Sequence, residues 1–73
     1  MDKLAEAIKA QYKRQNDAIQ AREKDSLVLY QNIFGKVDND IFMAMREVIF
    51  KCYKPIIDDA GRSIKILEAL RND

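Results

Sequence analysis

The sequence predicts an all-α fold: a helical hairpin of two long arms that pairs with a second hairpin into an antiparallel helical bundle. Two observations predict it. From Met1 to Ile33, positions spaced alternately by four and three residues are mostly apolar, and no proline or glycine precedes Gly35. After a short polar break, the same spacing resumes and continues to Leu70. Such spacing places side chains along one side of an α-helix, so the pattern predicts two helices.

The first arm is expected over residues 2–34. Its beginning is rich in Ala, Glu, Gln, Lys and Arg, which favour helix, and Asp2 suits the positive helix end. Asp25 and Ser26 could cap a separate second helix, which would give a three-helix fold. We favour one continuous helix because the spacing runs through this point. The positions that share the spacing are Met1, Ala5, Ile8, Tyr12, Gln15, Ile19, Arg22, Ser26, Leu29 and Ile33.

The turn is expected at residues 35–38 and the second arm at about 39–70. Gly35 supplies a left-handed stop, and Asp38, Asn39 and Asp40 supply a helix start with acid in its first turn. This acidic triplet lacks the spacing of a calcium loop, so capping is its better explanation.

The second arm carries two adjacent apolar lines. Pro55 lies inside both, and its missing N–H predicts a kink near residues 51–54 or two helices that meet there. Gly61 weakens the same region. The first line is Phe42, Met45, Ile49, Cys52, Ile56, Asp59, Ser63, Ile66 and Leu70. The second line is Tyr53, Ile57, Ala60, Ile64 and Leu67.

Length and composition favour a single helical domain, residues 1–73, without cofactor or metal. A chain of 73 residues is near the lower limit for a self-sufficient core. Cys52 is the lone cysteine and histidine is absent, so an intrachain disulfide is excluded and a zinc site is not expected. The chain also lacks the usual catalytic base and nucleophile, so we expect no enzyme activity.

The charges and the apolar segments predict a cytoplasmic protein without a membrane span. Thirteen basic and twelve acidic residues nearly balance. The most apolar window, residues 41–57, is too short and too charged to cross a bilayer. The N-terminus lacks the apolar stretch of a signal peptide.

The apolar surface of residues 41–53 is wider than one facing helix can cover. A homodimer core or a separate helix formed by residues 26–34 would cover it. A different protein could also dock on it, and the flexible or aromatic side chains would then be the anchors. These candidate interaction residues are Met43, Met45, Phe50 and Tyr53.

Four basic residues of the first arm, Lys9, Lys13, Arg14 and Arg22, are candidates for contacts with nucleic acid. Acidic residues interrupt them, and Tyr12 is the one nearby aromatic residue for base stacking. We therefore favour a small non-enzymatic intracellular regulator, adaptor or inhibitor that binds another protein through an apolar helix face. A nucleic-acid-binding helical bundle is the alternative.

Overall fold

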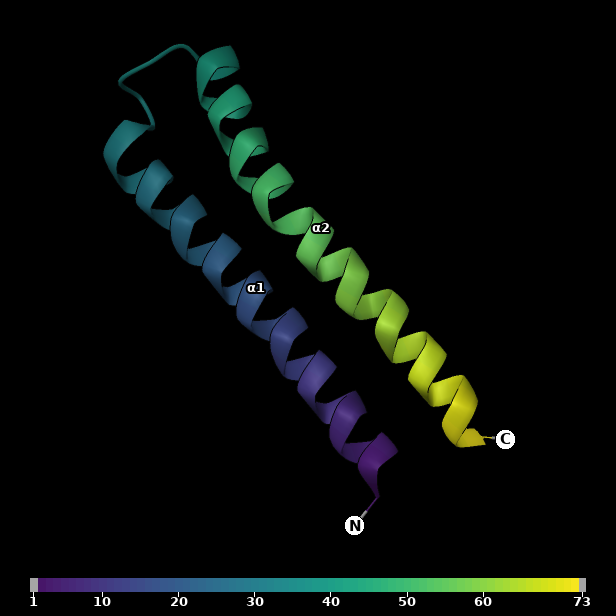
Figure 1. Ribbon diagram of the computed structural model, residues 1–73. Coiled ribbons are helices and arrows are strands. Elements are labelled where there is room, and N and C mark those ends of the chain that lie inside the picture. Colours follow the sequence, from purple (N-terminus) through teal and green to yellow (C-terminus); the bar gives the residue numbers. More distant parts are fainter. Residues whose placement is uncertain (1, 73) are drawn as a thin grey trace.

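The computed structural model describes residues 2–72, which form two α-helices, α1 (Lys3–Ile33) and α2 (Asn39–Asn72). The helices run antiparallel and side by side, with the beginning of α1 and the end of α2 at the same end of the hairpin (Figure 1). The hairpin measures 53 × 18 × 13 Å, so it is one layer of two helices. The predicted all-α hairpin is confirmed, and Met1, the first position of the predicted apolar line, lies outside the described residues.

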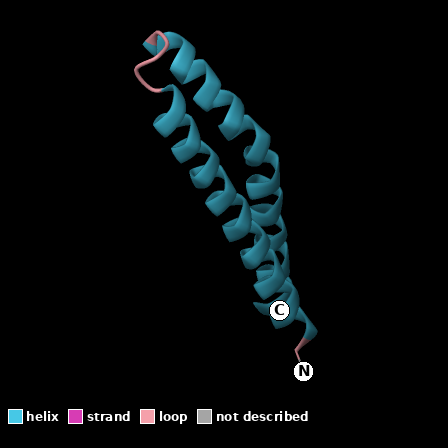
Figure 2. Cartoon of the chain, turned by 90° about the vertical axis from the view of Figure 1, so that its left-hand side faces the viewer, coloured by secondary structure: helices cyan, strands magenta, loops and turns pink. Residues whose placement is uncertain are grey.

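Local capping explains where α1 begins and ends. The Asp2 carboxylate accepts hydrogen bonds from the backbone N–H groups of Leu4 and Ala5 at 3.0 and 3.2 Å. These bonds satisfy N–H groups that have no partner within the helix. At the other end Gly35 adopts φ +83°, a left-handed conformation that glycine reaches without strain. Figure 2 shows the short loop that follows.

Both helices are unbroken, so neither of the alternatives with an additional helix boundary is correct. Helix α1 passes through Asp25 and Ser26, and residues 26–33 are its last turns rather than a separate helix. Helix α2 passes through Pro55 and continues to Asn72, two residues beyond the predicted end. It changes direction near its middle (Figure 2). Pro55 lies there and has no N–H to donate to the preceding turn.

The core lies along the seam between the helices. Within the described residues, its buried apolar side chains are Ile8, Ala18, Leu29, Phe42, Ala60 and Ile64. The predicted line on α1 is confirmed at most positions, although Tyr12 is exposed. On α2 the second line faces α1, whereas most of the first line faces outward. Phe42 and Ile49 lie on the side that faces α1, whereas Met45 and Cys52 are exposed, so the first line leaves the seam before Pro55. A seven-residue repeat also drifts by about 20° per heptad around a straight helix, which carries its later positions further outward.

The middle of the seam is closely packed and partly polar. The Gln15 side-chain amide donates a hydrogen bond to the Ile57 carbonyl at 3.3 Å. A Cβ atom at Gly61 would lie 3.3 Å from the same Gln15 nitrogen. Gly61 therefore makes room for Gln15 to cross the seam, which explains a glycine in the interior of a helix.

Candidate functional site

The four candidate interaction residues of α2 do not form one site. Met43 and Phe50 are seven residues apart and lie on the same side of the helix, where they line one groove. Met45 is exposed and points away from that groove, because two residues turn a helix by about 200°. Tyr53 is half-buried against α1. The 41–53 surface is therefore part core and part exposed surface.

A groove near the turn end of the hairpin runs between the two helices and has a volume of about 820 Å³. We call it the turn-end groove. Leu27 on α1 and Met43 on α2 are exposed along it, at 55% and 47%. Its lining residues are Arg22, Glu23, Ser26, Leu27, Tyr30, Phe42, Met43, Arg46 and Phe50.

Two guanidinium groups lie over the Phe50 ring in this groove. The Arg22 and Arg46 guanidinium carbons are 4.6 and 4.3 Å from the centre of this ring, which is cation–π geometry. Arg22 also pairs with Glu23 at 3.0 Å. Arg46 makes no ion pair with another residue of the described chain. The groove therefore carries an uncompensated positive charge beside apolar side chains.

Two polar atoms at the floor of the groove have no hydrogen-bond partner within residues 2–72. They are Arg22 Nε and Ser26 Oγ, and both are buried. A buried donor without a partner costs about 1–3 kcal/mol. In the polar middle of the α1 seam, the Gln15 side chain makes a hydrogen bond, Arg22 makes one through Nη2 to Glu23, and Ser26 Oγ makes none within residues 2–72.

An aromatic cluster closes the turn end of the groove. Tyr30 and Phe34 stack with ring centres 4.6 Å apart. Phe42 meets the Phe34 ring edge-on at 5.2 Å and the Tyr30 ring at 6.3 Å. These geometries are favourable for aromatic pairs. The cluster joins the last turn of α1 to the first turn of α2, so it fixes the groove's end.

Two tyrosine hydroxyls bridge the helices. Tyr53 donates to the Asp25 carboxylate, and Tyr12 donates to the Glu68 carboxylate at 3.0 Å. Each hydrogen bond holds the phenol in its protonated form, so each raises the pKa of its tyrosine. Tyr53 therefore joins α2 to α1, which is a structural role in addition to its place in the apolar surface of residues 41–53.

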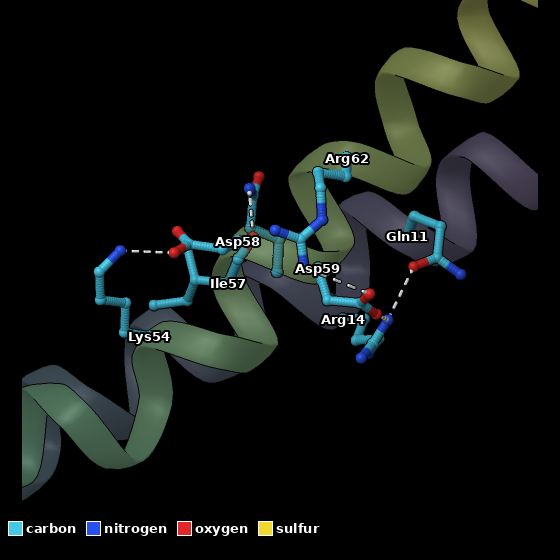
Figure 3. Close-up of polar contacts among 8 residues, drawn as sticks. Gln11, Arg14, Lys54, Ile57, Asp58, Asp59 and Arg62 are labelled. Atoms are coloured by element: carbon cyan, nitrogen blue, oxygen red, sulfur yellow. Dashed lines mark hydrogen bonds and ion pairs between the residues drawn. The ribbon is translucent and has the colours of Figure 1, made fainter.

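The basic residues proposed for nucleic-acid contact are mostly paired with acids. Lys13 lies 3.5 Å from Asp17, and Arg14 lies 2.9 Å from Asp59 on α2. Figure 3 shows Arg14 between Asp59 and Gln11. The Arg14 guanidinium also donates a hydrogen bond to the Gln11 side-chain oxygen at 3.2 Å. Arg22 belongs to the turn-end groove. Of the four candidates, only Lys9 makes no ion pair with a described residue.

A second apolar surface runs almost the full length of α2, on the side away from the turn-end groove. Its residues are exposed, and we call it the outer stripe. It consists of Ile41, Met45, Val48, Cys52, Ile56, Ile66 and Leu70. Asp59 and Ser63 interrupt it between its two ends. The predicted first line contained most of these positions but assigned them to one seam together with the core residues.

The described residues contain no group of three or more acids, cysteines or histidines that could hold a metal ion. Neither helix of the described chain contains a segment with the length and apolarity needed to cross a bilayer. No protein-family model, curated protein or solved structure matches this chain. The surfaces themselves are therefore the evidence on function.

Proposed function

We propose that this chain is a small non-enzymatic intracellular regulator, adaptor or inhibitor that binds another protein through the turn-end groove. One observation carries the proposal: Leu27 and Met43, from different helices, are about half exposed on either side of a groove with Phe50 inside it. Fully burying a large apolar side chain is worth roughly 1.5–3 kcal/mol, so covering the exposed half of Leu27 or of Met43 is worth about 1 kcal/mol each. A partner that covers all three side chains would gain binding free energy in proportion to the apolar area that it removes from water.

The lining of the groove supports a partner of particular chemistry. Arg46 makes no ion pair with another described residue, so its free charge calls for an anionic hydrogen-bond acceptor. A carboxylate is the acceptor that an arginine binds most strongly. The proposed partner is therefore a protein segment that places an apolar side chain near Phe50 and an acidic side chain near Arg46.

Adjacent residues of α1 allow a matched test. Leu27 lines the groove, whereas Val28 lies on another side of α1 beside Ile49, and the two are 55% and 50% exposed. We would capture partners from the producing cells with the wild type, Leu27→Glu and Val28→Glu, after circular dichroism shows that all three are helical. A partner retained by the wild type and Val28→Glu but lost by Leu27→Glu supports the proposal.

The charge requirement is tested on the same captured protein. Arg46→Glu is expected to weaken its binding at least tenfold, and Arg46→Lys is expected to weaken it less because the positive charge stays. Equal binding by all variants would contradict the assignment of the groove. Equal loss in Leu27→Glu and Val28→Glu would contradict it as well.

A nucleic-acid-binding helical bundle is the alternative, and the geometry supports it less. Three of its four basic candidates are held by acids, so fewer positive charges are available for phosphates. A gel-shift assay at low salt with single-stranded RNA and duplex DNA separates the two proposals. A retarded band that weakens steeply with added salt, and that is lost in Lys9→Glu, would favour the alternative.

A further inference from the structure

The outer stripe of α2 has the geometry of a second helix-packing seam. Ile41, Cys52 and Ile66 each directly precede a residue that faces α1. One residue turns an α-helix by about 100°, so the stripe lies about 100° around α2 from the side that faces α1. In a four-helix bundle each helix contacts two neighbours at about this angle. The stripe is therefore shaped for another helix rather than for a small molecule.

The exposed area of the hairpin also indicates a second chain. A compact monomer of 8.5 kDa exposes roughly 4,700 Å² by the usual scaling with mass. This chain exposes 5709 Å², which is about 1,000 Å² more. A stable protein interface removes about 800 Å² from each partner. The excess therefore matches what one chain contributes to an ordinary dimer.

We propose that a second copy of this chain covers the outer stripe, with the two α2 helices antiparallel and a twofold axis near Pro55 and Ile56. The stripe is self-complementary about that point. Antiparallel pairing places each position opposite the one at an equal distance beyond the axis. Ile41 then meets Leu70 of the second copy, and Met45 meets Ile66 of the second copy.

The interruptions of the stripe favour the antiparallel direction. A parallel pair would place Asp59 directly opposite Asp59 of the second copy, and like charges at a seam repel. In the antiparallel register Asp59 lies opposite Cys52, and Val48 lies opposite Ser63. Asp59 also keeps its ion pair with Arg14 at 2.9 Å, so its charge is compensated within its own hairpin.

The dimer leaves the turn-end groove uncovered, because Met43 and Phe50 lie on the far side of α2 from the stripe. Antiparallel pairing places the two turn-end grooves at opposite ends of the assembly. This inference rests on the stripe and goes beyond the proposed function. Failure of the dimer leaves the Leu27 and Arg46 tests unaffected, and the reverse is also true.

Disulfide cross-linking tests the proposed register. All variants carry Cys52→Ser, which removes the lone cysteine. Val48→Cys and Ser63→Cys together are expected to give a covalent dimer under mild oxidation. These two positions are roughly 22 Å apart in one helix, so a disulfide cannot form within one chain. Val48→Cys alone and Ser63→Cys alone are the matched controls and are expected to stay monomeric on a non-reducing gel.

Each outcome is decisive provided that the variants keep their helical circular dichroism. More than half of the double variant in the dimer band, with under a tenth for either single variant, supports the proposed register. Efficient cross-linking of Val48→Cys alone would indicate a parallel pair or a shifted register and would overturn it. Absence of any cross-link, at concentrations from micromolar to millimolar, would overturn the dimer itself.

Discussion

The contact between Gly61 and Gln15 gives a quantitative test of how the two helices approach each other. In an isolated helix, Gly61→Ala should stabilise by about 1 kcal/mol because alanine loses less backbone entropy. Here the new Cβ would lie 3.3 Å from Gln15 Nε2, which already donates to the Ile57 carbonyl at 3.3 Å. The Gln15 side chain must therefore move, and its hydrogen bond is lost or weakened.

The two effects are similar in size and opposite in sign. A hydrogen bond of this kind contributes about 0.5–1.5 kcal/mol. Gly61→Ala in the wild type should therefore change the free energy of unfolding by less than about 0.5 kcal/mol. In a Gln15→Ala background no side chain opposes the Cβ, so the gain should approach about 1 kcal/mol, or roughly 4–8 °C in Tm. The expected coupling energy is about 1 kcal/mol.

Thermal and urea unfolding of the four proteins, followed by circular dichroism at 222 nm, measures this cycle. All four are compared at one protein concentration, because association would add to the apparent stability. An equal stabilisation by Gly61→Ala in both backgrounds would refute the close approach. A loss of more than about 2 kcal/mol in both would show that a rigid neighbour, rather than the Gln15 side chain, opposes the Cβ.

Three further outcomes follow from named contacts. Phe42 is 8% exposed and touches two aromatic rings, so Phe42→Ala should cost about 3–5 kcal/mol and lower Tm by at least about 12 °C in a thermal melt. Gly35 has φ +83°, a left-handed conformation that strains an alanine, so Gly35→Ala should destabilise the fold by about 1 kcal/mol. The new Cβ would meet no atom within 4 Å, so the backbone strain is the whole cost, and an unchanged Tm would contradict it. The hydrogen bond to Asp25 raises the pKa of Tyr53 in the folded protein. This hydrogen bond therefore stabilises the fold below pH about 10, and the stabilisation is lost as the pH rises through the folded-state pKa of Tyr53. Urea midpoints of the wild type and Tyr53→Phe should therefore differ at pH 8 and converge above the folded-state pKa, and a constant difference would contradict the assignment.

The spacing of apolar residues predicted both helices and the turn because this information is local. Gly35 and Pro55 show the limits of such reasoning. A left-handed glycine ends a helix almost by itself, so the turn was predictable. Whether a proline breaks or only bends a helix depends on the packing around it, and the seam between α1 and α2 keeps α2 continuous.

The candidate site was only partly predictable. The spacing showed that α2 is apolar over more than one face, but it did not decide which line faces α1, since Cys52 and Tyr53 suit either role. Leu27 and Arg46 were missed as members of a groove because their neighbours come from the other helix. Arg46 did carry a local signal: it is a lone positive charge among apolar residues, four positions before Phe50.

The central claim is that the outer stripe of α2 is an interface between two copies of this chain. Light scattering on a sizing column, over protein concentrations from micromolar to millimolar, measures the molar mass directly. The account predicts twice 8.5 kDa for the wild type and a shift toward 8.5 kDa in Met45→Glu, which is expected to keep its helical circular dichroism because Met45 is exposed. A folded wild type of 8.5 kDa at every concentration would contradict it.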